Sequence, residues 1–276
     1  MKNINNNLIL DDKSFIKLTS YMKQKYGVEL GHKRNLVEGR LKNRVIEKGF
    51  DSFSAYIDYA MSLNSGLEMI DVIHKLTTHY TFFMREWEQF QYYTTTVLPY
   101  LQYTLSDKAI RLWSTGCSTG EEPYTLAILN KEFFSEESKD WDTRILATDL
   151  SERVIDTARK GVYLEEGLKN LPKGWKNSYF RKLDEERWQV KEEIRQQVIY
   201  RPFNLMSEDY YFKSPFHVIF CRNVMIYFNQ ATKIEVIKKL YDVTATGGYL
   251  FIGRSESIMQ QETEYRYVQP GIYRKE

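Results

Sequence analysis

The sequence has few of the residues and patterns that mark several large classes of protein. Its 276 residues include two cysteines, Cys117 and Cys221, which are too few for a secreted fold held together by disulfides. The four histidines and two cysteines lack the spacing of zinc ligands, so the sequence predicts no metal site. No apolar run reaches the length of a membrane span, and the asparagine-rich start has no signal-peptide pattern. These absences predict a cytoplasmic protein that does not insert into a membrane.

Charge is nearly balanced over the chain. The net charge of +2 gives no overall reason to expect nucleic acid as a partner. Hydrophobic residues make up 42% of the sequence, which is enough for a substantial core. The length allows one large domain or two small ones.

Residues 1–76 have apolar side chains at helical spacing and few strand signals. Three stripes of this kind are Phe15, Leu18 and Met22; Val37, Leu41 and Val45; and Phe53, Tyr56, Ile57 and Ala60. Asp51 and Ser52 stand before the third stripe as a helix start signal. We therefore predict an N-terminal domain of helices at 1–76.

The remaining residues, 77–276, alternate short apolar strands with helices after Leu98 and Pro99. The predicted strands are 110–113, 144–148, 198–201, 217–221 and 248–252, and the predicted helices are 124–134, 152–160 and 230–244. A terminal hairpin is expected at 265–274, with its turn at Pro270 and Gly271. This alternation predicts an α/β fold with a doubly wound, mostly parallel sheet.

The segment 161–197 interrupts this alternation. It is too long for a single loop in a compact domain, and its apolar residues partly alternate with charged ones. We interpret it as an inserted subdomain built on a small antiparallel sheet. One helix followed by a long loop is the alternative.

The most informative segment is 111–127, in which a buried strand leads through a loop of small residues into a helix. Gly116, Ser118 and Gly120 allow the backbone to turn sharply and approach a ligand closely. The loop has no Gly-Lys-Ser/Thr ending to bind a triphosphate, and Glu121 and Glu122 stand where a phosphate would lie. Acidic residues at a helix start repel pyrophosphate and suit a cation such as S-adenosylmethionine. A tight turn followed by an acidic capping pair is the alternative.

Polar residues also follow the other predicted strands. Asp149 ends the second strand, Asn204 follows the third, and Arg222 and Asn223 follow the fourth. Ligands of doubly wound sheets bind beyond the carboxyl ends of the strands, and an acid after the second strand can accept both ribose hydroxyls. Taken singly, Asp149 fits a helix cap, and the asparagines fit loops that bond their own backbone. Together they favour one cofactor cleft.

Five segments resemble the bacterial chemotaxis receptor methyltransferases. They are 77–86, 120–124, 147–149, 203–205 and 220–228, the last containing Cys-Arg-Asn-Val-Met-Ile-Tyr-Phe at 221–228. The resemblance covers nearly the whole chain. It implies a Rossmann-like methyltransferase sheet and transfer of a methyl group from S-adenosylmethionine to glutamate side chains, leaving S-adenosylhomocysteine. It also implies a partner, the cytoplasmic helical region of chemotaxis receptors.

The same resemblance implies roles for individual residues. Those implied to bind the cofactor are His79, Thr81 and Arg85; Gly116, Glu121 or Glu122, and Asp149; Asn204 and Leu205 beside the adenine; and Asn223 and Val224. Arg85 and Tyr227 are implied to be the catalytic groups on the substrate side. This chain departs from the family at His79, where asparagine is usual, and an imidazole still offers one hydrogen bond there.

Two surfaces bear on receptor docking. Lys33, Arg40 and Arg44 recur at helical spacing and predict a basic face for an acidic receptor helix, with a solvated face as the alternative. Residues 181–189 of the insertion contain no glycine. They therefore resemble family members that do not use the receptor's C-terminal tail peptide. Separately, we expect the protein to be a monomer.

The implied chemistry needs no general base, because a glutamate is already ionised at neutral pH. We assign Arg85 to positioning and Tyr227 to a weaker hydrogen bond, since a tight pair with arginine stabilises the ground-state anion most. The plainer alternatives are a salt bridge of Arg85 with Glu86 or Glu88, and core packing for Tyr227. Two rival functions are a non-catalytic cofactor sensor or receptor adaptor, and a Rossmann-type dehydrogenase.

Overall fold

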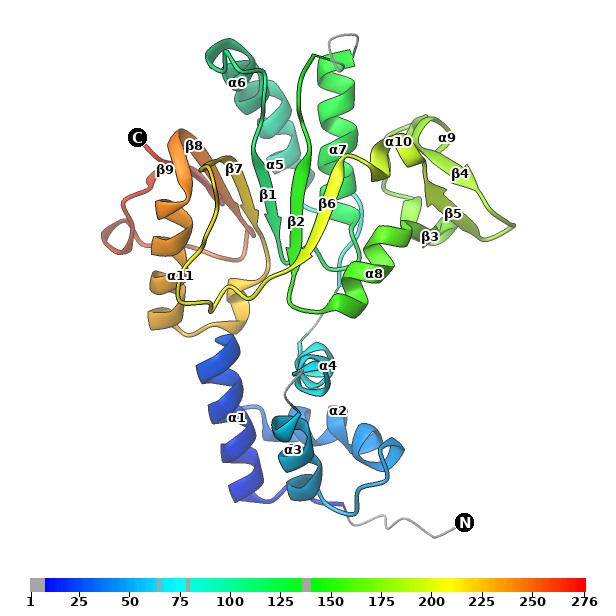
Figure 1. Ribbon diagram of the computed structural model, residues 1–276, viewed down its shortest axis with the longest axis vertical. Helices are drawn as coiled ribbons and strands as arrows, with labels where there is room; N and C mark the ends of the chain where they lie inside the picture. Colours follow the sequence, from blue (N-terminus) through cyan, green and yellow to red (C-terminus); the bar gives the residue numbers. More distant parts are fainter. Residues whose placement is uncertain (1–7, 64–65, 78–79, 136–139) are drawn as a thin grey trace. The chain divides into compact units, whose positions relative to one another are not determined.

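A computed structural model describes residues 8–63, 66–77, 80–135 and 140–276 (Figure 1). The chain divides into two compact units. The first consists of Met1–His79 with Tyr227–Lys233, and the second of Tyr80–Ile226 with Ile234–Glu276. None of the helices among the described residues has both the length and the hydropathy of a membrane span.

The first unit is helical, as its periodicity predicts. Its helices are α1 (Asp12–Tyr26), α2 (Arg34–Glu47), α3 (Phe53–Ser62) and α4 (Leu67–Leu76). The Asp11 carboxylate caps α1 by accepting from the Ser14 amide, and the Ser52 hydroxyl caps α3 by accepting from the Ala55 amide. Apart from the partly buried Phe15, every member of the three predicted stripes is buried. These side chains form the core of the unit.

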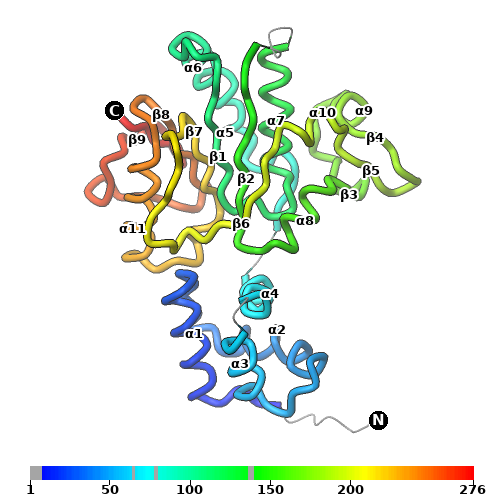
Figure 2. The backbone as a smooth tube through the Cα atoms, in the orientation of Figure 1, coloured from blue at the N-terminus to red at the C-terminus, as the bar shows by residue number. Residues whose placement is uncertain are grey.

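The second unit is built on a seven-stranded sheet with the order β6-β2-β1-β7-β8-β10-β9 (Figures 1 and 2). Its strands are β1 (Leu112–Thr115), β2 (Ile145–Asp149), β6 (Val198–Pro202), β7 (Phe216–Cys221), β8 (Thr244–Ile252), β9 (Arg266–Gln269) and β10 (Ile272–Arg274). The first five pair in parallel, and β10 runs antiparallel to β8 and β9. The doubly wound sheet and the terminal hairpin are thus confirmed, with Gly271 at φ +75° in the hairpin turn.

Helices accompany this sheet as the alternation predicts. They are α5 (Trp87–Tyr92), a π-helical turn (Tyr93–Val97), α6 (Leu98–Thr104), α7 (Glu121–Phe134), α8 (Glu152–Lys160) and α11 (Gln230–Asp242). Both α7 and α8 pack against β2 and β6. Trp113, Tyr93, Phe220 and Phe251 are fully buried in the core beside the central strands.

The segment after α8 forms a separate small sheet. It contains β3 (Val162–Leu164), β4 (Phe180–Lys182) and β5 (Arg187–Val190), in the antiparallel order β3-β5-β4, with short helices α9 (Trp175–Tyr179) and α10 (Glu192–Arg195). This confirms the inserted antiparallel sheet over the helix-and-loop alternative. The turn between β4 and β5 is closed by Asp184, whose carboxylate accepts from the amides of Glu186 and Arg187. An aspartate therefore forms this turn without a glycine.

Candidate functional site

The carboxyl ends of the parallel strands lie at one edge of the large sheet. The loops after β1, β2, β6 and β7 contain most of the site residues predicted from the sequence. This edge is where doubly wound sheets bind their ligands. The contacts among these loops are therefore the geometry of the candidate site.

Gly116 and Val224 come from the loops after β1 and β7, and the structure brings them together. Gly116 has φ +68°, and a Cβ there would lie 2.4 Å from Cγ2 of Val224. Gly120 has φ +99°, and a Cβ there would lie 2.9 Å from both Ala158 Cβ and the Tyr200 hydroxyl. Both positions therefore need glycine for conformation and for space. The loop lies too close to its neighbours to accept side chains here.

Asp149 joins the loop after β1 to the turn after β2. One carboxylate oxygen accepts from the Ser118 amide at 2.9 Å, and the other accepts from the Ser151 amide at 3.0 Å. The side chain is therefore more than a local cap of α8, because it also holds a loop 31 residues away in sequence. Beside it, the hydroxyl oxygen of Ser118 is buried with no hydrogen-bond partner among the described residues. This edge thus keeps an unsatisfied polar atom next to an acid.

Glu121 and Glu122, the acidic pair at the start of α7, have different hydrogen-bond partners. Glu122 accepts from the Ser114 hydroxyl at 2.7 Å and from the Arg222 guanidinium at 3.1 Å. Glu121 accepts from the Thr119 hydroxyl at 2.7 Å. Burial raises the pKa of both carboxyls, and Arg222 opposes the rise only for Glu122. Glu121 is therefore the acid that gains more from an added cation.

Arg222 is the centre of a buried network that the sequence did not reveal. Its side chain is 2% exposed and lies 3.3 Å from the Glu86 carboxylate and 3.1 Å from that of Glu122. It also donates to the main-chain carbonyl of Arg85 and lies over the ring of Phe90. The sequence analysis placed Arg222 after the fourth predicted strand, but it gave no sign of these distant partners. Arg222 thus connects the end of β7 with the segment before α5 and the start of α7.

Arg85 is not the partner of either neighbouring acid. Glu86 pairs with Arg222 and accepts from the amide of Arg254, and Glu88 pairs with the Arg254 guanidinium at 2.9 Å. The Arg85 guanidinium donates instead to the carbonyl of Tyr80 at 2.5 Å. Among the described residues, the salt-bridge alternative for Arg85 is therefore wrong. Thr81 lies partly buried in the same segment.

Glu256 is a residue that the sequence analysis missed. It accepts from the backbone amides of Gly253, Asn223 and Ile226 at 2.7, 2.9 and 3.0 Å. These bonds hold Asn223 at φ +57°, a conformation that asparagine tolerates better than most residues. Glu256 follows β8 by four residues. The rule applied to the other strand ends would therefore have pointed to it.

Asn204 shows the local bonding that was the alternative for it. Its side-chain oxygen accepts from the Met206 amide at 3.0 Å, and Leu205 beside it is buried. Tyr227 belongs to the first unit, where its carbonyl accepts from the Glu29 amide at 2.8 Å. His79 lies outside the described residues. For these positions a role in cofactor or substrate binding stays a prediction.

The predicted basic face on α2 is largely occupied by contacts within the first unit. Arg44 is bonded to Glu68 at 2.9 Å and to Asp71 at 3.0 Å, and its side chain is 17% exposed. Arg40 donates to the carbonyl of Leu76 at 3.0 Å, at the end of α4. Lys33 is exposed just before α2. Helical spacing did not reveal the ion pairs of Arg44, and a docking role for the three residues stays a prediction.

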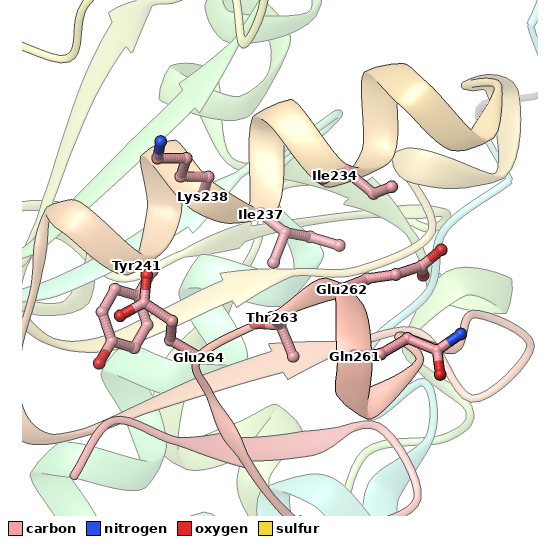
Figure 3. Close-up of a pocket in the computed structure, with 8 residues that line it drawn as sticks. All are labelled: Ile234, Ile237, Lys238, Tyr241, Gln261, Glu262, Thr263 and Glu264. Atoms are coloured by element: carbon pink, nitrogen blue, oxygen red, sulfur yellow. The ribbon is translucent and has the colours of Figure 1, made fainter.

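A pocket also lies on the second unit between α11 and residues 261–264 (Figure 3). Its lining residues are Ile234, Ile237, Lys238, Tyr241, Gln261, Glu262, Thr263 and Glu264. None of them is a site residue predicted from the sequence. We assign this pocket no role in the site at the strand ends.

Comparison with known proteins covers nearly the whole chain. The all-alpha domain of the CheR methyltransferases matches residues 13–77, and their SAM binding domain matches residues 79–273. A chemotaxis protein methyltransferase of Borreliella burgdorferi is 36% identical over 277 residues, covering 99% of this chain and 97% of the relative. The chemotaxis protein methyltransferase of Escherichia coli K12 is 32% identical over 268 residues, covering 94% of this chain and 89% of the relative.

Proposed function

Because the chain belongs to the CheR methyltransferase family, we propose that it methylates glutamate side chains of chemotaxis receptors with S-adenosylmethionine. The products are glutamate methyl esters and S-adenosylhomocysteine. The supporting observation is the buried acidic edge formed by Glu121 and Asp149 around a glycine loop. The family membership overturns the dehydrogenase alternative. Nothing in the comparisons favours a non-catalytic sensor or adaptor.

The residues at the strand ends fit this cofactor. Glu121 is buried with a raised pKa, so it suits the ammonium of the amino-acid end. Asp149 ends β2, and an acid at this position of a doubly wound sheet can accept ribose hydroxyls, since each carboxylate oxygen can accept more than one hydrogen bond. The Ser118 hydroxyl, which has no hydrogen-bond partner among the described residues, is available to a cofactor bound at this edge. When bound, the cofactor supplies an electrophilic methyl group on its sulfonium.

The protein's own contribution to the reaction is to position the substrate and exclude water. The glutamate to be methylated is ionised at neutral pH, so no residue has to remove a proton. We propose that Arg85 orients this carboxylate and that Tyr227 donates a weaker hydrogen bond to it. Holding the reacting groups in near-attack geometry is the main source of rate in such a site.

For receptor docking we propose a basic surface reduced to Lys33 and Arg40. Arg44 is left out because Glu68 and Asp71 neutralise it. We also propose that the insertion does not bind a receptor tail peptide, because an aspartate forms its β4–β5 turn where tail-binding members have a glycine. The chain would then act as a cytoplasmic monomer on the helical region of the receptor.

The test of this function is transfer of a radiolabelled methyl group from S-adenosylmethionine to a receptor's cytoplasmic fragment. Label on a glutamate ester is released as volatile methanol by mild base, whereas label on nitrogen is retained. We expect base-labile label, and its loss when S-adenosylhomocysteine is in excess. Cofactor binding without any transfer would instead support the sensor or adaptor.

An Asp149→Ala protein is expected to bind S-adenosylhomocysteine about 1–3 kcal/mol more weakly, because the ribose hydroxyls lose their acceptor. Isothermal calorimetry measures this change. Asp156→Ala is the matched control, since that carboxylate forms a surface pair with Arg159. Equal affinities for the two folded variants would remove Asp149 from the cofactor site.

A Lys33→Glu protein is expected to methylate receptor fragments more slowly at low salt, because the acidic receptor helix is then repelled. Its rate should also depend less on salt, since screening lengths fall from about 10 Å at 0.1 M to about 3 Å at 1 M. Lys13→Glu, an equal charge change on α1, is the control. If both variants behave alike, or if removing the receptor tail abolishes methylation, the docking proposal is wrong.

A further inference from the structure

One contact links the inserted sheet to the glycine loop. The Tyr163 hydroxyl donates to the main-chain carbonyl of Thr119 at 2.7 Å. Tyr163 lies in the middle of β3, where it pairs with Trp188 of β5. Its ring meets the ring of Phe83 edge-on, with centroids 4.9 Å apart. The insertion therefore contacts both the loop after β1 and the segment that contains Thr81 and Arg85.

Only Gly161 and Val162 separate the end of α8 from Tyr163. Gly161 ends α8 at φ +59°, in a position where a Cβ would lie 3.2 Å from the Tyr124 hydroxyl and 3.3 Å from Val190. Two residues later, Tyr163 is beside the loop. The hydroxyl of Tyr163 lies 3.0 Å from where a Cβ on Gly120 would be, so the loop has no room to shift toward it.

The contact continues from Thr119 to an acid of the site. The Thr119 hydroxyl donates to the Glu121 carboxylate at 2.7 Å. Burial, and then the nearby Glu121 charge, raises the pKa of Tyr163 well above that of an ordinary phenol. The tyrosine is therefore protonated at neutral pH and always available as a donor. The Tyr163 hydroxyl thus holds the main chain of Thr119, and the Thr119 side chain in turn orients Glu121.

We propose that Tyr163 is a positioning residue for the cofactor. It acts through Thr119 to aim Glu121 at the amino-acid end of S-adenosylmethionine, so that the inserted sheet sets the affinity for that end. The inference rests on the proposed function, in which Glu121 binds the ammonium. Tyr163 itself touches no reacting atom.

The test compares two ligands that differ only at the relevant end. S-adenosylhomocysteine has the amino-acid end, and 5′-methylthioadenosine has the same adenosine without it. Tyr163→Phe keeps the ring and removes one hydrogen bond, so we expect its Kd for S-adenosylhomocysteine to rise about 3- to 10-fold. Its Kd for 5′-methylthioadenosine should change less than about 2-fold. In turnover, the KM for S-adenosylmethionine should rise while kcat is retained.

The control is Tyr93→Phe, which removes a buried hydroxyl that donates to Asn130 within the same unit. It matches the chemical change without touching the glycine loop, and both ligands should bind it as they bind the wild-type protein. Thr119→Val is a second variant, which keeps the carbonyl and loses the hydroxyl. It should show the same ligand selectivity, and combining it with Tyr163→Phe should add little.

Three results would overturn the inference. They are equal weakening of both ligands by Tyr163→Phe, an effect no larger than that of Tyr93→Phe, and unchanged binding by Thr119→Val. Failure of the proposed function looks different, because the wild-type protein itself would then either bind neither S-adenosylhomocysteine nor S-adenosylmethionine, or bind them without transferring a methyl group to a receptor fragment.

Discussion

An Arg222→Met protein is expected to lose about 3–5 kcal/mol of the free energy of unfolding of the second unit. Arg222 is 2% exposed and pairs with Glu86 and Glu122, whose side chains are 16% and 15% exposed. Methionine keeps most of the packing but leaves two largely covered carboxylates without their cation. Such uncompensated charges cost more than the pair itself contributes.

Urea unfolding followed by tryptophan fluorescence measures this loss. All five tryptophans lie in the second unit, so the signal reports on that unit alone. The control is Arg254→Met, which breaks a half-exposed pair with Glu88 and should cost at most about 1 kcal/mol. Adding Glu86→Gln and Glu122→Gln to Arg222→Met should recover part of the loss. If Arg222→Met costs no more than Arg254→Met, the network does not stabilise the fold.

An Arg85→Ala protein is expected to lose roughly 100-fold in kcat for methyl transfer, because the receptor carboxylate is no longer held in line with the methyl group. The fold should survive, since Arg222 binds the main-chain carbonyl of residue 85 and not its side chain. Single-turnover methylation of a receptor fragment measures the change. Tyr227→Phe removes one hydroxyl and should reduce kcat by about 10-fold or less.

Two controls make this prediction specific. Arg85→Lys keeps the charge but loses the planar fork, so it should fall between wild type and Arg85→Ala. Arg254→Ala removes a nearby surface cation and should leave kcat unchanged. Full activity of Arg85→Ala, with normal cofactor affinity, would mean that another group orients the substrate.

Local patterns in the sequence were enough for the order of elements. The helix predicted at 152–160 is α8, which ends where Gly161 takes the left-handed conformation. Five of the strands were found as short apolar runs. The predicted boundaries were wrong where the local sequence pattern is weak. Strand β8 begins at Thr244, four residues before its predicted start, because the pair Gly247 and Gly248 is more typical of a turn than of a strand. Helix α7 begins at Glu121, as the acidic pair predicts, although its apolar periodicity is clear only from Tyr124.

The β–α alternation is enough to predict which chemical groups gather at the strand ends, among them Gly116, Glu121, Asp149 and Asn223. The partner of each charged group is visible only in the folded chain. There Glu122 pairs with Arg222, Glu121 accepts from Thr119, and Arg44 pairs with Glu68. The reason is that periodicity reports burial over a few residues. The partner of a charge depends on contacts between distant segments, such as the bond from Arg222 to the carbonyl of Arg85, 137 residues away.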